Sequence, residues 1–356
     1  TVQLLDNGFF EMDQAYYKGA LLDQPNLYTQ KLVELLGGRI GVKGEVADDW
    51  HKKIACAMQQ ISEDIALHML DKLYKKTQSE NLVLGGGFFM NSVFNGKIKA
   101  LTPFKNIFIP YAPTDAGNSI GAALYVAHHI RDDERKIQSN SSHIGYSPKN
   151  EDIKRALKRR HLNYTEVDDR EKAIAKLLSQ GEIVAVCNGK MEFGERALGN
   201  RSILGDPRKL EVKEKINAII KYRENYRPFA PVTLQSEVSK YFEVEQSFTA
   251  NYMEKVVKMR EKYKDQLEAV VHVDGSGRVQ TINHETNPEF SKIIEEFRIL
   301  TGLPFVLNTS FNINGEPIVL SPDDALNTFF NSGLEHLYIG NFYISKVASL
   351  TEPNKK

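Results

Sequence analysis

Short apolar runs followed by helical patterns set the strongest limit on how this chain folds. From Asp48 to Thr77, apolar residues recur three and four positions apart, which predicts one long helix. Apolar runs at Asn81–Leu84 and Lys105–Pro110 are expected to be short strands. A helix is expected to begin at Asn91, and another to follow the second strand and end near His129. Strands that alternate with helices indicate an α/β fold.

The second half of the chain also mixes both element types. Arg131–Ser142 is charged and polar, which is typical of a linker. Ser321 is the expected N-cap residue of the last helix. Helices are expected at Asn150–Arg160, Glu171–Gln180, Asn251–Leu267 and Pro322–Phe330, and strands at Ile183–Cys187, Val270–Val273, Phe305–Asn308 and Leu337–Ser345.

Arginine is concentrated in one segment, Gly189–Pro231, which is rich in Gly, Pro and Asn. Guanidinium groups on a turn-rich backbone are suited to bidentate binding of phosphate or carboxylate oxygens. The alternative is a solvated charged surface, although such a surface more often uses Lys and Glu on a regular helix. Acidic residues of the segment (Glu192, Glu195 and Asp206) are possible partners for some of the cations. The cations are Arg196, Arg201, Lys221, Arg208, Arg223 and Arg227.

The overall charge excludes some classes of partner. Lys plus Arg and Asp plus Glu number 46 each, so no global field attracts nucleic acid or a membrane surface. No apolar run approaches the roughly 20 residues that cross a bilayer. The two cysteines, Cys56 and Cys187, have no disulfide or metal-type spacing, which fits a reducing compartment and predicts a cytoplasmic protein.

Three other stretches carry groups that can bind ligands. Gly85–Gly87 lies between a strand and a helix start, where backbone N–H groups can hold a phosphate, although a plain tight turn explains it equally well. Asp115, at another helix start, is either an N-cap or a carboxylate ligand of a metal. Polar side chains also follow later strands, at His272–Arg278 and Leu307–Gly315, where they either bind a ligand or cap loops.

Several long motifs occur in order between about residue 80 and residue 346. They read Gly-Lys-Met-Glu-Phe-Gly-Glu-Arg-Ala-Leu-Gly-Asn-Arg-Ser-Ile-Leu, Asp-Pro-Arg, Arg-Pro-Phe-Ala-Pro, His-Val-Asp-Gly and Leu-Asn-Thr-Ser-Phe-Asn. The glycine turn and Pro-Thr-Asp-Ala-Gly-Asn-Ser-Ile-Gly-Ala-Ala belong to the same set. Together these motifs resemble the O-carbamoyltransferases of nodulation-factor and antibiotic tailoring.

The resemblance implies a fold and an activity. Members combine an actin-like ATPase (ASKHA) domain with a YrdC-like α/β domain. Residues 1–137 would be the second ASKHA lobe, and residues 138–350 the YrdC-like domain. The YrdC-like part would make carbamoyl-adenylate from carbamoyl phosphate and ATP. The ASKHA-like part would transfer the carbamoyl group to a hydroxyl of a small-molecule acceptor, assisted by a divalent metal of the Mg or Fe type.

The resemblance also implies roles for single residues. Positive charge would offset the repulsion between carbamate and ATP as pyrophosphate leaves. The adenylate in the ASKHA-like half would contact Gly86, Gly87 and Asn91, and Asp115 would be a metal ligand. The residues that would bind carbamoyl phosphate or ATP are Arg196, Arg201, Arg208, Lys221, Arg227, Arg278, Asn308 and Ser310.

The chain departs from the family pattern at two places. Glu195 stands before Arg196, where the family usually has proline. The N-terminal ASKHA lobe and its His-x-x-x-His metal motif do not occur, so the metal site is expected to be incomplete. We therefore expect a C-terminal fragment of a longer carbamoyltransferase.

Two other functions remain as alternatives. A YrdC-like fold can present a concave basic surface to RNA, but the zero net charge and the concentration of arginine in one segment argue against it. A sugar-kinase-like ATPase built on the ASKHA half is the other alternative, and the missing first lobe argues against that one.

Overall fold

The computed structural model describes residues 1–18, 27–42, 44–135 and 141–346. The chain forms two compact units, which are described separately below. The first unit comprises Thr1–Val83 and Lys97–Phe108, and the second comprises Leu84–Gly96 and Ile109–Lys356. Helix α3 (Ser92–Leu101) has residues in both units.

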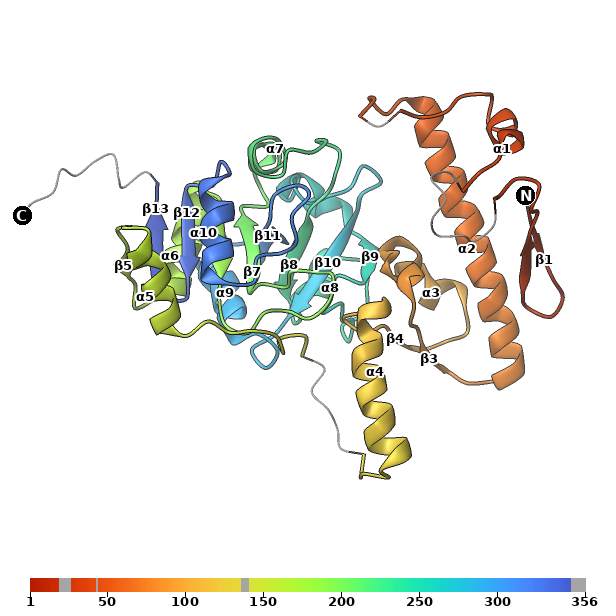
Figure 1. Ribbon diagram of the computed structural model, residues 1–356, viewed down its shortest axis with the longest axis horizontal. Coiled ribbons are helices and arrows are strands. Elements are labelled where there is room, and N and C mark those ends of the chain that lie inside the picture. Colours follow the sequence, from red (N-terminus) through yellow and green to blue (C-terminus); the bar gives the residue numbers. More distant parts are fainter. Residues whose placement is uncertain (19–26, 43, 136–140, 347–356) are drawn as a thin grey trace, which may run out of the picture. The chain divides into compact units, whose positions relative to one another are not determined.

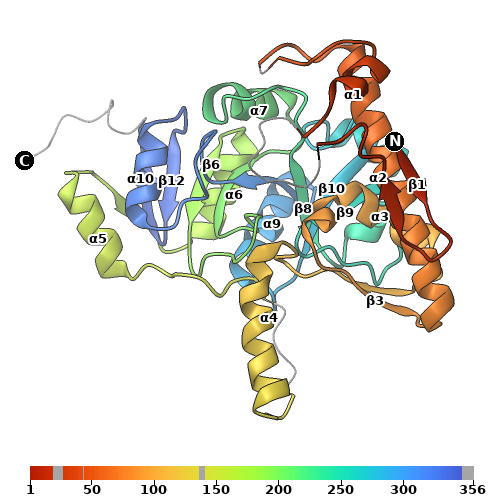
Figure 2. The same cartoon turned by 45° about the vertical axis from the view of Figure 1, so that its right-hand side comes forward.

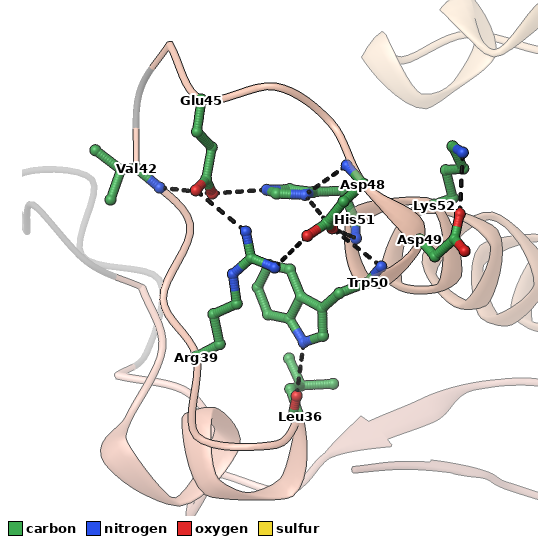
Figure 3. Close-up of polar contacts among 9 residues, drawn as sticks. All are labelled: Leu36, Arg39, Val42, Glu45, Asp48, Asp49, Trp50, His51 and Lys52. Atoms are coloured by element: carbon green, nitrogen blue, oxygen red, sulfur yellow. Dashed lines mark hydrogen bonds and ion pairs between the residues drawn. The ribbon is translucent and has the colours of Figure 1, made fainter.

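The long helix α2 (Asp49–Thr77) dominates the first unit (Figure 1). Its N-cap is Asp48, whose carboxylate accepts hydrogen bonds from the backbone N–H groups of Trp50 and His51. Arg39 donates to the same carboxylate at 2.5 Å, and His51 lies 2.7 Å from Glu45 (Figure 3). Hydrogen bonds from Arg39 and then His51 hold the pKa of the Asp48 carboxyl well below its usual range. This network explains why the helix starts where it does.

Short elements complete the first unit. One antiparallel hairpin pairs Val2 with Met12, and one parallel pair joins Asn81 to Asn106. His68 of α2 lies 2.7 Å from the backbone oxygen of Leu5 and so ties the helix to the loop of that hairpin. The elements are β1 (Val2–Leu4), β2 (Phe10–Met12), α1 (Gln30–Leu35), β3 (Asn81–Val83) and β4 (Asn106–Phe108).

The second unit is built on a nine-stranded mixed sheet. Its order is β5-β13-β12-β6-β7-β11-β8-β10-β9. The pairs β12–β6 and β10–β8 are parallel, and the others are antiparallel. The strands are β5 (Thr165–Glu166), β6 (Val184–Cys187), β7 (Arg201–Gly205), β8 (Ala230–Leu234), β9 (Lys255–Lys258), β10 (Ser276–Ile282), β11 (Phe305–Ser310), β12 (His336–Ile339) and β13 (Phe342–Ser345).

Helices cover both faces of this sheet (Figure 2). Apolar residues of α6 and α9, such as Ile174 and Phe297, pack on one face. Residues of α5, α7 and α10, such as Ile153 and Val212, pack on the other. The central strands are therefore buried on both sides, which explains their almost continuous apolar sequence. The longer helices are α5 (Asn150–Arg159), α6 (Arg170–Gln180), α9 (Pro288–Thr301) and α10 (Pro322–Phe330).

Shorter helical segments connect these elements. The 3-10 turn η1 (Gly87–Met90) precedes α3, and η2 (Asp115–Gly117) leads into α4 and then the π-helical turn η3 (Val126–Ile130). The π-helical turn η4 (Ile216–Ile220) extends α7. The remaining segments are α4 (Asn118–Tyr125), α7 (Leu210–Lys215), α8 (Val238–Tyr241) and η5 (Glu261–Gln266). Across the described residues, no helix combines the length and the apolar character needed to pass through a bilayer.

The structure confirms the α/β class and most of the predicted elements. The predicted helix Asp48–Thr77 is α2, and Pro322–Phe330 is α10 with Ser321 as its N-cap. The predicted strand Leu337–Ser345 is instead a hairpin of two strands that turns at Gly340, where φ is +55°. The predicted boundary between 137 and 138 and the last predicted residues, 347–350, lie outside the described residues. The assignments to ASKHA-like and YrdC-like domains stay predictions.

Two predicted elements were wrong. Asn251–Leu267 was expected to be a helix, but it contains β9 and the 3-10 helix η5. Val256 and Val257 pair with β10 at the edge of the sheet, and this long-range pairing outweighs the local helical pattern. Val270–Val273 was expected to be a strand, but these residues form the turn that precedes β10.

Gly199 in the loop between β6 and β7 is expected to tolerate no side chain. Its φ is +124°, and a Cβ atom would overlap the ring of Phe290 in α9. Gly199→Ala should therefore lower the free energy of unfolding by about 2 kcal/mol or more, measured by urea denaturation. Gly302→Ala is the control, because Gly302 has φ +80° with open space around it. Equal effects of the two substitutions would show that the Phe290 contact does not matter.

Candidate anion-binding site

Polar side chains of β10 and β11 hold the arginine-rich loop over the sheet. Gln280 of β10 donates to the backbone oxygen of Leu198 at 3.0 Å. Asn308 of β11 donates to the backbone oxygen of Ala197 at 3.1 Å and to the Gln280 side-chain oxygen at 3.0 Å. Because alternate residues of a strand share a face, Arg278 lies on the same face of β10 as Gln280. The sheet thus brings Arg278 and the loop that begins at Arg196 to one place.

Glu192 shapes this loop. One of its carboxylate oxygens accepts hydrogen bonds from the backbone N–H groups of Leu198 at 2.7 Å, Asn200 at 2.8 Å and Arg201 at 3.4 Å. Glu192 is buried, so these three bonds replace the hydration of its charge. The sequence suggested Glu192 only as an ion-pair partner for arginine, and no local signal pointed to its contact with the backbone.

Arg201, a predicted ligand for phosphate, is completely buried. Its guanidinium donates to backbone oxygens of Asn188 at 2.5 Å, Tyr146 at 3.2 Å and Leu320 at 3.3 Å, and to two neighbouring carbonyls. These contacts occupy the guanidinium and join three chain segments. This geometry favours a role in holding the loops rather than in binding an anion.

Three arginines, Arg196, Arg223 and Arg278, lie near one another in this part of the sheet. The side chains of Arg196 and Arg278 form no hydrogen bond or ion pair of standard geometry with another described residue. Burial, and then the charges of Arg196 and Arg223, lower the pKa of Arg278 to about 9. Burial also lowers the pKa of Arg196, which Glu195 opposes. Arg278 therefore lies in a partly dehydrated place near the charges of Arg196 and Arg223. An anion would stabilise the charged form of Arg278, and we call these three residues the arginine cluster.

Lys221 and Ser310, both predicted ligands, are in contact with each other. The Lys221 ammonium donates to the backbone oxygen of Ser310 at 2.5 Å and lies 3.2 Å from its hydroxyl oxygen. It also donates to the side-chain oxygen of Asn312 at 2.6 Å and to the backbone oxygen at 2.9 Å. Burial, and then the charge of Arg223, lowers the pKa of Lys221 to about 7. Lys221 therefore places a titratable cation beside the arginine cluster.

Anion binding is expected to weaken as Lys221 loses its proton. Sulfate affinity should fall about tenfold between about pH 6 and about pH 9, because the positive charge of Lys221 near the anion is lost. Sulfate is used because the charge of a phosphate changes near neutral pH. Calorimetric titration checks this, and Lys221→Met should give a flat profile. A wild-type profile as flat as that of the variant would contradict the assignment.

The lowered pKa of Lys221 also makes the stability of the folded protein depend on pH. The pKa of Lys221 in the folded protein lies below its ordinary value of 10.5. Between about pH 7 and about pH 10 the unfolded chain therefore binds more protons than the folded chain, and the contribution of Lys221 to stability rises with pH. Lys221→Met should remove this part of the pH dependence.

The other two predicted cations already have partners. Arg227 is largely exposed and forms an ion pair with Glu224 at 2.8 Å. Arg208 forms a two-point contact with buried Asp206, at 2.9 Å from Nε and 2.7 Å from Nη2. Its guanidinium also lies 5.5 Å from the ring of Phe297, in the apolar layer of α6 and α9. The structure therefore does not bring Arg208 to the arginine cluster.

The glycine turn forms part of the second unit. The backbone N–H of Gly86 donates to the backbone oxygen of Pro113 at 2.6 Å, and the φ of Gly86 is +111°. Asn91 accepts a hydrogen bond from the backbone of Phe94 at 3.2 Å, so it caps the start of α3. Phe89, next to the glycine turn, lines a small pocket together with Arg196. The segment that directly follows the glycine turn thus shares a pocket with Arg196.

Glu195 connects the arginine loop to the Asp115 turn. Its carboxylate accepts a hydrogen bond from the hydroxyl of Thr114, and its second oxygen is buried without a partner among the described residues. Thr114, rather than Asp115, caps the turn by accepting from the backbone N–H of Ala116 at 3.4 Å. Asp115 is exposed, which leaves its carboxylate available as a ligand.

Asp115 alone does not make a metal site. Among the described residues, it belongs to no group of three potential ligands. The group that does exist, Glu182, Glu335 and His336, has ligand atoms within 4.8 Å of one another. Its members already have partners: Lys215 lies 3.2 Å from Glu335, and His336 lies 3.3 Å from Glu182 and 2.7 Å from the hydroxyl of Tyr343. The residues present therefore do not fit a resident metal at Asp115.

Comparison with known proteins identifies the family. Residues 4–124 match the model of the carbamoyltransferase N-terminus, and residues 175–346 match that of the carbamoyltransferase C-terminus. The chain belongs to the carbamoyltransferase family. The arginine cluster and Lys221 all lie in the segment that matches the C-terminal model.

Similar proteins in this family come from several bacteria. An uncharacterized protein, sll1178, of Synechocystis is 35% identical over 98% of this chain and 60% of its own length. The nodulation protein NolO of Bradyrhizobium diazoefficiens is 38% identical over 85% of this chain and 56% of its own. The 3'-hydroxymethylcephem-O-carbamoyltransferase of Amycolatopsis lactamdurans is 29% identical over 74% and 49%. The chain thus spans at most 60% of the length of these relatives.

Part of this chain is also similar to part of a solved structure. The crystal structure of T. kodakarensis HypF gives a TM-score of 0.34 with 15% identity, over 48% of this chain and 22% of that one. This likeness is too weak to assign the domains of the present chain.

Proposed function

We propose that this chain is part of an ATP-dependent O-carbamoyltransferase. In the proposed reaction, water cleaves carbamoyl phosphate to carbamate and phosphate. An oxygen of carbamate then attacks the α-phosphorus of ATP. A new bond to that phosphorus forms, the bond to the β-phosphate oxygen breaks, and pyrophosphate leaves with the electron pair. The carbamoyl group of the resulting carbamoyl-adenylate is transferred to the hydroxyl of an acceptor, and AMP is released.

The observation that carries this proposal is the arginine cluster. Burial, and then the charges of Arg196 and Arg223, lower the pKa of Arg278, so its side chain lies in a partly dehydrated place near two other cations. Such a place suits a reaction that joins carbamate to ATP, because the fixed positive charges offset the repulsion between the two anions. The residues do this by binding and orienting phosphate groups, so no step in this part requires a side chain to become covalently attached.

The acceptor site is proposed by analogy with the relatives. The Amycolatopsis relative is named for a hydroxymethyl acceptor, and we extend to this chain only the class: a hydroxyl group on a small molecule. We further propose a cytoplasmic enzyme, since carbamoyl phosphate and ATP are cytoplasmic metabolites, and a YrdC-like fold for the arginine-bearing domain. Metal assistance in the transfer step would require ligands in addition to Asp115.

Pyrophosphate release tests the proposal. The chain with carbamoyl phosphate, ATP and Mg²⁺ should release pyrophosphate, while omission of carbamoyl phosphate should reduce the signal to background. Arg227→Ala should lower the rate strongly, because Arg227 lies near Arg223, whose pKa its charge lowers, and its exposed pair with Glu224 can open to bind substrate. Arg155→Ala is the matched control, since Arg155 is an exposed arginine of α5 paired with Asp152. A folded sample that releases no pyrophosphate would count against the function, and equal rates for the two variants would remove Arg227 from the site.

A further inference from the structure

His272 lies in the turn before β10 and uses only one of its two ring nitrogens. Its Nδ1 lies 3.1 Å from the hydroxyl oxygen of Ser276, and its backbone N–H donates to the backbone oxygen of Ser276 at 2.8 Å. Its Nε2 is buried and has no hydrogen-bond partner among the described residues. Folded proteins rarely leave a buried polar atom without a partner, so this nitrogen calls for a functional explanation.

The contacts of Ser276 determine which ring nitrogen of His272 carries the proton. The Ser276 hydroxyl donates to a carboxylate oxygen of Asp274 at 2.6 Å, and the backbone N–H of Ser276 donates to the same oxygen at 3.0 Å. Because the hydroxyl proton is directed at Asp274, the Ser276 oxygen accepts from Nδ1–H of His272. In the neutral ring Nε2 then carries a lone pair. A ring oriented at one nitrogen by a chain that ends in a carboxylate is typical of a general base.

His272 is held beside the arginine cluster by the geometry of β10. Alternate residues of a strand share a face, so Ser276, Arg278 and Gln280 form one row of side chains. Gln280 binds the backbone of the arginine-rich loop, and Ser276, at the other end of the row, binds His272. The imidazole is therefore held at the end of a row of side chains that includes Arg278.

The charges around His272 favour its neutral form. Burial lowers the pKa of His272, Asp274 opposes this, and the charges of Arg278 and of Lys213 in α7 lower it further. Lys258 of β9 lies 3.7 Å from the Asp274 carboxylate and offsets part of its charge. Near neutral pH the Nε2 atom is thus able to accept a proton.

Two other groups near the arginine cluster are less suited to accept a proton. The Lys221 nitrogen already donates to oxygens of Ser310 and Asn312, which need it as a donor. Glu195, next to Arg196, is the alternative base, because its second carboxylate oxygen is also buried without a partner among the described residues. An imidazole is better matched than a carboxylate to proton transfer near neutral pH, which favours His272.

We propose that His272 is the catalytic base that activates the water that cleaves carbamoyl phosphate. The inference rests on the proposed function, which assigns no residue to that water. The water oxygen forms a bond to the carbonyl carbon while Nε2 takes one water proton. The bond from this carbon to the phosphate oxygen breaks, and phosphate leaves with the electron pair. The proton on Nε2 then passes to the phosphate, and the second water proton is lost as carbamic acid ionises to carbamate.

Comparison of two carbamoyl donors tests this step separately from the formation of the adenylate. The full chain is incubated with ATP, Mg²⁺ and either carbamoyl phosphate or freshly dissolved ammonium carbamate, and pyrophosphate is measured. His272→Gln should lower the rate with carbamoyl phosphate by about 100-fold or more, the usual contribution of a general base. Its rate with carbamate should stay within about threefold of the wild-type rate, because carbamate enters after the water step.

Two further variants make the test specific. His284→Gln is the matched control, since His284 is an exposed histidine paired with Glu295 at 2.9 Å, and it should change neither rate. Ser276→Ala covers the case in which His272→Gln does not fold. It removes the acceptor that orients Nδ1 and should lower the rate with carbamoyl phosphate alone, by about tenfold. A merely structural role of Ser276 would lower the rates with both donors.

Three results would overturn the inference. They are a wild-type rate with carbamoyl phosphate in His272→Gln, an equal loss with both donors in a folded variant, and a loss with carbamoyl phosphate in Glu195→Gln but not in His272→Gln. If the wild type forms pyrophosphate with both donors and His272 does not matter, only the inference fails. If phosphate release from carbamoyl phosphate depends on His272 but neither donor yields pyrophosphate, only the proposed function fails.

Discussion

Arg278→Gln should abolish anion binding while making the protein more stable. Arg278 lacks a partner among the described residues, and its pKa is lowered to about 9 by burial and by the charges of Arg196 and Arg223. Loss of two charge-assisted hydrogen bonds costs about 3–5 kcal/mol, so pyrophosphate affinity should fall by roughly 100-fold or more. Loss of an uncompensated cation should at the same time raise the midpoint of thermal unfolding.

The predicted loss of affinity and gain of stability distinguish a ligand-binding arginine from a structural one. A structural arginine would lower both stability and binding when it is replaced, whereas a ligand-binding arginine without a counter-ion lowers binding alone. Arg298→Gln on the exposed surface of α9 is the control and should change neither quantity. Unchanged pyrophosphate affinity in Arg278→Gln would show that the anion binds elsewhere.

Arg201→Met should lower the stability of the protein but leave anion binding nearly unchanged. The side chain of Arg201 is fully buried and donates to the backbone oxygens of Asn188, Tyr146 and Leu320. Methionine fills a similar volume but leaves these carbonyls without donors, which should lower the free energy of unfolding by about 3–5 kcal/mol. Chemical denaturation measures this loss.

Anion binding by the Arg201→Met protein separates the two possible roles. At a temperature where the variant is still folded, its pyrophosphate affinity should stay within about threefold of the wild type, because the guanidinium is saturated by backbone oxygens. Wild-type stability together with lost anion binding would instead identify Arg201 as a ligand residue, as the sequence predicted.

The sequence pointed to the segment that carries the candidate site, but it did not distinguish the roles of the arginines in that segment. Arg201 and Arg196 lie five positions apart in one motif, and both are arginines between glycines. Only the sheet decides their roles: Arg201 begins β7 and is covered from both sides, whereas Arg196 lies in the preceding loop and has no partner among the described residues. A short segment cannot show which of its side chains the rest of the fold will cover.

Long-range contacts account for the other differences. Asn251–Leu267 has a helical distribution of polar residues, yet Val256 pairs with Arg278 of β10 in the register of an antiparallel edge. The role of Glu192 could not be predicted either. Its carboxylate accepts hydrogen bonds from backbone N–H groups, and such contacts do not depend on the residue types involved. By contrast, α2 and α10 were predictable, since capping residues and apolar spacing are local properties.

The identity of the nucleotide product tests the central claim most directly. The full chain is incubated with ATP, Mg²⁺ and carbamoyl phosphate, and the products are separated by ion-exchange chromatography. The proposed chemistry predicts AMP and pyrophosphate in equal amounts, both dependent on carbamoyl phosphate and both lost in Arg278→Gln. Formation of ADP and phosphate by a folded sample, whether or not carbamoyl phosphate is present, would indicate a kinase-like ATPase and would contradict the account.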